Sequence, residues 1–200
     1  MSPWSAAALG DPIANIETPA LLLDLDAFER NLQCMVEALK GSGMRLRAHA
    51  KSHKCPEIAL RQVAMGAVGI CCQKVSEAAV FVDAGIEDVL VTNQIASLAK
   101  ARRLANLAHK ARIGVLVDDA RQVLRLQQAA ADADVSLDVY VEVDVGSGRC
   151  GVAPGDEAVA LAAGGTEPRY TCNGVLDSSV SPEESIARIR TSMSGTVFFS

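Results

Sequence analysis

Short apolar segments and amphipathic segments alternate along most of this chain, and this alternation limits the possible folds more than any other feature. Residues 45–51, 67–73, 88–93, 112–119 and 137–146 read as strands, and a helical pattern joins each one to the next. At least five strand–helix repeats with short connections predict a parallel sheet with helical crossovers. Most of these strands are apolar on both faces, as expected when helices cover a parallel sheet.

Two α/β architectures fit this alternation, an open doubly wound sheet and a (β/α)8 barrel. An open nucleotide-binding sheet usually carries a glycine-rich turn after its first strand, and this sequence has none there. A complete barrel takes ~250 residues, so a chain of 200 residues has room for about six βα units. From the residues alone, both architectures remain open.

Composition indicates a globular domain and excludes several classes of partner. The chain is 50% hydrophobic and 22% charged, with a net charge of -5, which offers no broad basic surface for nucleic acid or an anionic membrane. No segment approaches the ~18 apolar residues of a membrane span, and the first residues do not resemble a secretory signal. We therefore expect a cytoplasmic protein that binds neither nucleic acid nor membrane.

Six cysteines are irregularly spaced, which favours reduced thiols in the core over disulfides. A metal site built from Cys55, Cys71, Cys72 and Cys150 is the alternative. The sequence has no C-x-x-C pair, and adjacent cysteines do not easily bind one ion together. We predict no metal ligands.

The segment "RLRAHAKSHKCPEIA" (45–59) carries basic side chains at every second position: Arg45, Arg47, His49 and Lys51. Side chains alternate between the faces of a strand, so these four share one face. Lys51 comes at the carboxyl end of the strand, where βα folds place their sites. Cationic neighbours disfavour the charged amine, which makes Lys51 a candidate Schiff-base nucleophile. The rivals lie in loops: Lys54, Lys74 and, as a hydrogen-bonding residue, His53.

A second segment, "EVDVGSGRCG" (142–151), runs from a strand into a turn with glycines at 146, 148 and 151. Glycines allow a tight turn or close approach to a ligand. Such a turn would hold Arg149 in place, and a fixed guanidinium suits a phenolate or carboxylate oxygen. On its own, a glycine-rich turn is a weak indication.

Four segments in unbroken order resemble a known family. They are "TPALLLDLDAFERNL", "RLRAHAKSHKCPEIA", "GAVGICCQKVSEAAVFVDAGIEDVLVTN" and "VEVDVGSGRCGV", within residues 17–155. They are similar to the N-terminal barrel of fold-type III pyridoxal-phosphate enzymes, in particular the D-threonine aldolase and D-serine dehydratase group. Alanine racemase shares this barrel more distantly.

The resemblance implies an incomplete (β/α)8 barrel of the alanine racemase N-terminal type. Residues 1–16 would be an irregular start, 17–163 the partial cofactor-binding barrel, and 164–200 a divergent segment in place of the family's C-terminal β domain. The resemblance also implies the cofactor, pyridoxal phosphate, and its site. Lys51 would form the Schiff base and Arg149 would lie near the phenolic oxygen, and the pocket would be lined by His49, Arg47 and Gln73.

The implied activity is that of a lyase in D-amino acid metabolism that cleaves D-3-hydroxy-amino acids to glycine and an aldehyde. Full-length members of the family also imply a homodimer and a divalent metal, Mn²⁺ or Mg²⁺. The metal ligands and the phosphate loop of those members have no counterpart in residues 164–200, so we expect a truncated enzyme with little activity alone. The alternatives are a D-serine or D-3-hydroxyaspartate dehydratase or aldolase relative, a non-catalytic cofactor-binding barrel, and an inert fragment.

Overall fold

The structure is a computed structural model that describes residues 7–163. It divides the chain into two compact units, Met1–Ala38 and Leu39–Ser200. In the first unit, a short 3-10 helix η1 (Ile13–Asn15) precedes the long helix α1 (Leu25–Leu39). The Asp24 carboxylate accepts the main-chain N–H of Ala27 at 2.9 Å and so caps this helix. The predicted divergent segment, 164–200, lies outside the described residues.

The second unit is built on a parallel sheet of five strands that lie in their sequence order. The strands are β1 (Ala48–His49), β2 (Ile70–Cys72), β3 (Asp88–Val91), β4 (Arg112–Val117) and β5 (Asp138–Val141). A doubly wound sheet reverses its strand order at a switch point, whereas these five strands follow one another without reversal. The fold is therefore the partial barrel, and the predicted alternation is confirmed.

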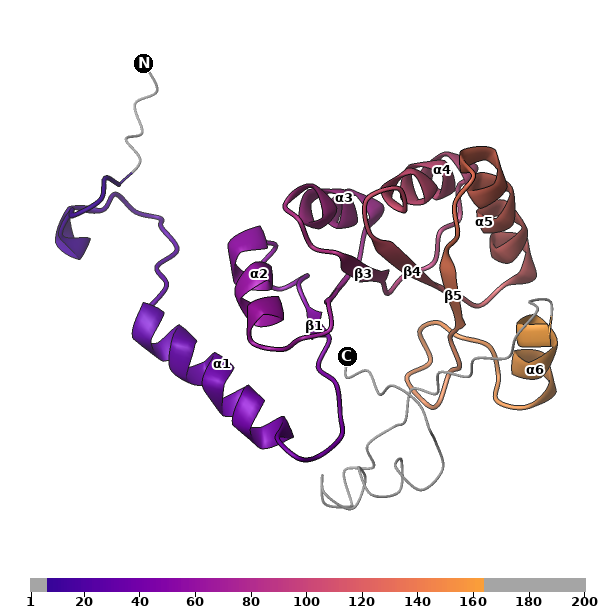
Figure 1. Ribbon diagram of the computed structural model, residues 1–200, viewed down its shortest axis with the longest axis horizontal. Coiled ribbons are helices and arrows are strands. Elements are labelled where there is room, and N and C mark those ends of the chain that lie inside the picture. The colour runs from indigo at the N-terminus through magenta and orange to yellow at the C-terminus, as the bar shows by residue number, and fades with distance from the viewer. Residues whose placement is uncertain (1–6, 164–200) are drawn as a thin grey trace. The chain divides into compact units, whose positions relative to one another are not determined.

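Helices connect successive strands and cover one face of the sheet. They are α2 (Pro56–Ala64), α3 (Val75–Asp83), α4 (Leu98–Leu107), α5 (Ala120–Ala133) and, after β5, α6 (Asp156–Ala163). Figure 1 shows α3, α4 and α5 side by side along β3, β4 and β5. No helix in residues 7–163 is both long and apolar enough to cross a bilayer.

Ser76, directly before "EAAVFVDA", is a favourable cap residue, so the sequence predicts that it caps α3, and the start of this helix differs from that prediction. The helix begins at Val75, one residue earlier, after Lys74. The Glu77 carboxylate reaches back and accepts the main-chain N–H groups of Gln73 at 2.9 Å and Lys74 at 3.2 Å. A carboxylate in the first turn satisfies these free donors, so Ser76 is not needed as a cap.

The two faces of the sheet have separate apolar clusters. The larger cluster lies between the strands and the helices and includes Phe81 and Leu104. The opposite face carries a small cluster of Cys71, Leu90 and Leu116, against which Tyr140 packs. We call this opposite face the inner face, because in a (β/α)8 barrel the face away from the helices lines the barrel interior.

Strand β1 is shorter than the predicted 45–51. Main-chain bonds continue the pairing on both sides of it, from Val68 N–H to the Leu46 carbonyl and from Ala50 N–H to the Cys71 carbonyl, both at 2.8 Å. The chain then turns, and Lys54 N–H donates to the Ala50 carbonyl at 2.8 Å. Lys51 therefore lies in the turn just after the strand and not within it.

Candidate functional site

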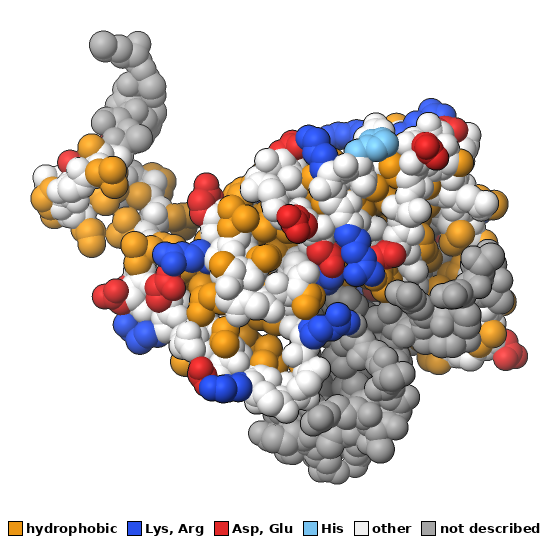
Figure 2. All heavy atoms as spheres, viewed as in Figure 1, with side chains coloured by type: hydrophobic (Ala, Val, Ile, Leu, Met, Phe, Trp, Pro, Cys, Tyr) orange, Lys and Arg blue, Asp and Glu red, His pale blue; other side chains and the backbone are white. Residues whose placement is uncertain are grey.

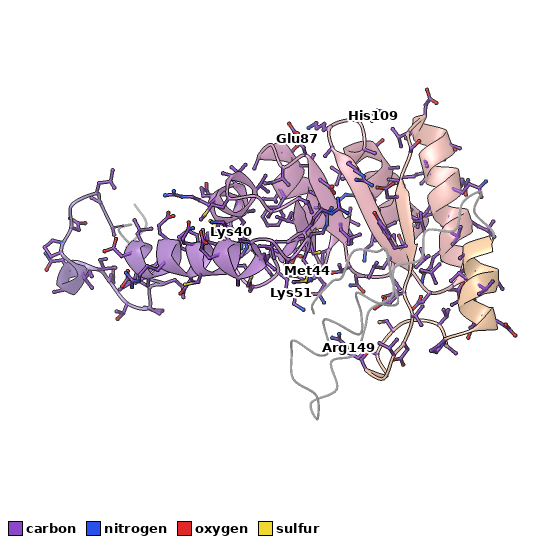
Figure 3. All side chains as sticks on the ribbon, turned by 60° about the horizontal axis from the view of Figure 1, so that its bottom comes forward. Lys40, Met44, Lys51, Glu87, His109 and Arg149 are labelled. Carbon is purple, nitrogen blue, oxygen red and sulfur yellow. The ribbon has the colours of Figure 1, made fainter. Side chains whose placement is uncertain are left out.

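Lys51 and Arg149 lie at the same end of the sheet. Figure 3 shows both at the end opposite Glu87 and His109, which corresponds to the carboxyl ends of the strands. Both side chains belong to exposed residues, and neither forms an ion pair with any carboxylate of the described residues. This end of the sheet thus presents an amine and a guanidinium that are available to a ligand.

His49 connects Lys51 to the sheet. Its Nδ1 accepts the main-chain N–H of Lys51 at 3.3 Å, and its Nε2 lies 2.9 Å from Oγ1 of Thr92, at the end of β3. The ring is partly buried. Burial lowers the pKa of His49, and the nearby charge of Lys51 lowers it further, while Glu77 acts weakly in the opposite direction. His49 is therefore a neutral side chain at physiological pH.

Arg149 is carried by a tight loop, residues 144–151, which we call the glycine loop. Its ends pair through Asp144 N–H and the Val152 carbonyl at 2.9 Å, and the Asp144 carboxylate accepts the N–H groups of Gly146 and Gly148. These donors hold the pKa of Asp144 below its usual range. At Gly151, with φ of +100°, a Cβ would lie 2.5 Å from the Asp144 nitrogen. The loop therefore has little freedom.

Gln73 follows β2 directly and is exposed. Its main-chain N–H is held by Glu77, as described above, which fixes the turn between β2 and α3. Because the carboxyl ends of parallel strands meet at one edge, Gln73 shares the edge of Lys51 and Thr92. Its position stays compatible with the predicted pocket.

Arg47 lies at the other end of the inner face. Its guanidinium binds the Asp88 carboxylate through two bonds of 2.8 Å, and its side chain is only 10% exposed. Asp88 is the first residue of β3, so this pair sits at the amino ends of the strands. The charge of Arg47 is thus matched by Asp88 and directed away from Lys51, and we leave Arg47 out of the proposed cofactor site.

The rivals of Lys51 have other surroundings. Lys54 lies 3.5 Å from Glu77, and Lys74 stands at the start of α3. His53 packs edge-on against Phe81, with ring centres 6.4 Å apart, and its Nδ1 accepts the N–H of Cys55 at 3.1 Å. Burial lowers the pKa of His53. These contacts favour structural roles for Lys54 and His53.

The cysteine-based metal site does not assemble. Cys71 belongs to the inner-face cluster and Cys72 to the helix-covered cluster, so their thiols point to opposite faces. Burial raises the pKa of each thiol to about 12. Both are core thiols, as the sequence indicated.

The sequence reasoning missed a pair of carboxylates, Asp118 and Glu142. Together with Cys150, they place ligand atoms within 4.8 Å of one another. Asp118 accepts N–H groups from Gln122 at 2.9 Å and Gly151 at 3.1 Å, and burial raises the pKa of Glu142. Each acid directly follows or ends a strand, which was the available signal. Since hydrogen bonds already engage these carboxylates, we assign no metal to them.

Comparisons with known proteins agree with this geometry. The profile described as alanine racemase, N-terminal domain, matches residues 23–178. A D-threonine aldolase from Arthrobacter sp is 53% identical over 153 residues, which are 76% of this chain and 40% of that protein. A 3-hydroxy-D-aspartate aldolase from Paracoccus denitrificans is 44% identical over 165 residues, 81% of this chain and 43% of that protein.

Solved structures give the same result. The crystal structure of D-threonine aldolase from Filomicrobium marinum superposes with a TM-score of 0.77 at 58% identity, over 78% of this chain and 42% of that one. D-threo-3-hydroxyaspartate dehydratase from Delftia sp. HT23 gives a TM-score of 0.65 at 28% identity, over 74% and 38% of the two chains. The chain spans about two fifths of the length of these relatives.

Proposed function

Because this chain belongs to the alanine racemase N-terminal domain family, we propose that it is the cofactor-binding barrel of a pyridoxal-phosphate-dependent lyase of the D-threonine aldolase type. One observation carries the proposal. Lys51, in the motif that resembles the cofactor lysine of this family, is exposed at the carboxyl end of β1 and has its main chain fixed by His49. The 53% identity to a D-threonine aldolase supports the same assignment.

The residues at this end fit the cofactor. Pyridoxal phosphate carries an aldehyde and anionic oxygens, and this end offers a primary amine, a guanidinium and the amide of Gln73. Within residues 7–163, neither Lys51 nor Arg149 forms an ion pair with a carboxylate. We propose Lys51 as the covalent attachment point, Arg149 as the partner of the phenolic oxygen, and His49 and Gln73 as lining residues.

When bound, the cofactor supplies an electron sink that weakens bonds at the substrate Cα. The residues of this chain would do the rest of the work on this side of the site. Lys51 would be the point of covalent attachment of the cofactor aldehyde, and the guanidinium of Arg149 would bind the phenolic oxygen. Because His49 is neutral, the positive charge at this end would come from Lys51 and Arg149.

The substrate of the proposed reaction is a D-3-hydroxy-amino acid. Removal of the hydroxyl proton and cleavage of the Cα–Cβ bond convert it to glycine and an aldehyde, so that D-threonine gives glycine and acetaldehyde. From the resemblance we also propose that the full-length protein binds a divalent metal, Mn²⁺ or Mg²⁺, and forms a homodimer. We propose residues 17–163 as the barrel part and the cytoplasm as the location.

An assay of D-threonine cleavage tests this function. The chain, with pyridoxal phosphate and Mn²⁺ added, is incubated with D-threonine or L-threonine, and glycine and acetaldehyde are measured. We expect a low yield of both products, in equal amounts and from the D isomer only, and none from Lys51→Ala. Lys74→Ala is the matched control, since it removes an exposed lysine from the same end of the sheet. Activity that survives Lys51→Ala would contradict the assignment.

A dehydratase is the second candidate, because D-threo-3-hydroxyaspartate dehydratase from Delftia sp. (strain HT23) is 30% identical over 156 residues. Dehydration releases ammonia and an oxo acid in place of glycine. The same incubation with D-3-hydroxyaspartate distinguishes the two reactions by product. Cofactor binding with neither product would favour the non-catalytic barrel.

A further inference from the structure

Thr92 occupies an unusual position at the end of β3, between two strands. Its main-chain N–H donates to the Cys72 carbonyl at 2.9 Å, which continues the pairing with β2. Its hydroxyl donates to the same carbonyl at 3.2 Å and lies 2.9 Å from Nε2 of His49. One hydroxyl thus contacts the carboxyl ends of β1 and β2 from β3.

These contacts determine which ring nitrogen of His49 carries the proton. Nδ1 accepts the main-chain N–H of Lys51 and so carries no hydrogen. In a neutral ring the proton is then on Nε2, which faces the Thr92 hydroxyl. That hydroxyl can accept Nε2–H and donate its own hydrogen to the Cys72 carbonyl, so its two contacts fit the Nε2–H tautomer.

We propose that Thr92 is a positioning residue for the cofactor lysine, acting through the tautomer of His49. The hydroxyl accepts Nε2–H, which leaves Nδ1 free to accept the N–H of Lys51 and so to fix Lys51 within the turn after β1. The rest of that turn is closed by Lys54 N–H on the Ala50 carbonyl. The part that concerns Lys51 as a cofactor residue rests on the function proposed above; the tautomer does not.

The charged groups around His49 agree with a neutral ring. Lys51 disfavours a second positive charge, and Glu77, which would favour one, already accepts the N–H groups of Gln73 and Lys74. A proton on Nδ1 would also face the Lys51 N–H, donor against donor. The arrangement therefore holds only while Nδ1 is unprotonated.

Nitrogen NMR of the ring reads the tautomer directly and needs no cofactor. The chain has three histidines, so ¹⁵N-histidine labelling gives three ring systems, and His49→Gln identifies the signals of His49. At pH 8 we expect a protonated Nε2 and an unprotonated Nδ1 in the wild type. In Thr92→Val we expect His49 alone to move toward a mixture of tautomers, with wild-type shifts restored in Thr92→Ser.

Thr92→Val is a suitable probe because valine has the same shape and keeps the main-chain bond to Cys72. Circular dichroism and the thermal midpoint of each variant confirm that it is folded. A protonated Nδ1 in the wild type, or unchanged His49 shifts in a folded Thr92→Val, would overturn the proposal.

The effect on Lys51 is measured separately, by titration with pyridoxal phosphate. Loss of one hydrogen bond of about 1 kcal/mol should weaken cofactor binding about fivefold in Thr92→Val, and Thr92→Ser should recover it. Equal affinity in Thr92→Val and the wild type would overturn the positioning role. An absent absorption band in the wild type itself would instead overturn the proposed function, while the NMR result decides the tautomer on its own.

Discussion

The two ends of the inner face differ in whether their charged side chains form ion pairs. At the amino ends of the strands, Arg47, Asp88, Arg112 and Asp138 alternate in sign, and each is in contact with the next: Arg47 with Asp88 at 2.8 Å, Arg112 with Asp88 at 3.8 Å, and Arg112 with Asp138 at 2.6 Å. We call these four residues the amino-end charge network. At the carboxyl ends, Lys51 and Arg149 have no ion-pair partner within the described part of the chain.

One short strand contributes to both ends. Arg47 directly precedes β1 and belongs to the network, whereas Lys51 is the second residue after β1 and is exposed. A matched, partly buried charge depends on its partner, because loss of one partner leaves the other charge buried and unpaired. Unmatched exposed cations are available to an anionic ligand. The difference between the ends therefore separates the residues that pair across neighbouring strands from those that we propose to bind the cofactor. Elsewhere on the surface, Figure 2 shows acidic and basic side chains interspersed over the face in view.

The largest effect on stability should come from breaking the amino-end charge network. Arg47→Met leaves the Asp88 carboxylate without its two hydrogen bonds in a site that is 23% exposed. Removing one partner of a largely buried pair costs about 3 kcal/mol. Urea unfolding should show that loss in the free energy of unfolding.

The double variant Arg47→Met with Asp88→Leu is the control, because it removes both charges and should recover much of the loss. If the single variant is as stable as the wild type, the network does not stabilise the fold.

The next effect should fall on binding at the other end. Gly151→Ala places a Cβ 2.5 Å from the Asp144 nitrogen, so the glycine loop must shift and move Arg149. Strain of about 1.4 kcal/mol corresponds to a tenfold loss of pyridoxal-phosphate affinity. Absorbance titration measures it.

Gly155→Ala is the matched control for that experiment. Gly155 has a similar φ, +105°, but nothing lies within 4 Å of the added Cβ. It should share the backbone strain without displacing Arg149. Equal affinity losses in the two variants would show that the clash at Gly151 is irrelevant to binding.

A smaller, pH-dependent effect is expected at Glu142. Burial raises the pKa of Glu142 in the folded state, so folding favours its protonated form. The contribution of this group to stability is then complete below its unfolded pKa of about 4.3 and is lost as pH rises through the folded value. Glutamine does not ionise, so Glu142→Gln should not lose stability as the pH rises. At pH 7 its free energy of unfolding should exceed that of the wild type by less than about 1 kcal/mol. Urea unfolding at pH 4 and pH 7 measures it; a gain that is larger at pH 4 would contradict the sign.

The smallest effect should come from an exposed ion pair. Lys110 lies 2.8 Å from Asp83, but the two side chains are 64% and 62% exposed. Such pairs contribute about 0.5 kcal/mol or less. Lys110→Ala should therefore leave the thermal midpoint almost unchanged, and a loss comparable to that of Arg47→Met would mean that burial is not what distinguishes the network.

Much of the fold follows from local patterns in the sequence. The apolar runs correspond to every strand of the sheet, and a helix joins each of these strands to the next, as the alternation predicts. The order of strands was not available from the runs themselves, because pairing depends on contacts between distant residues. The family resemblance favoured the barrel, and the sequential pairing from β1 to β5 confirms it.

The site was less predictable than the fold. Lys51 could be proposed because its motif is local, although β1 ends at His49 and not at Lys51 as the strand pattern predicts. The partner of Arg47 could not be found, since Asp88 lies 41 residues away and the alternation of side chains gives a face but no position along it. The proposed role of Thr92 could not be predicted for the same reason, because it depends on a contact with His49, 43 residues earlier.

Identification of the lysine that reacts with the cofactor tests the central claim most directly. The folded wild-type chain is mixed with pyridoxal phosphate, reduced with borohydride, digested and analysed by mass spectrometry. We predict one phosphopyridoxyl group per chain, on Lys51, and none on the ion-paired Lys54. A folded protein that carries no adduct, or one with its adduct on Lys54 or Lys74, would contradict the account.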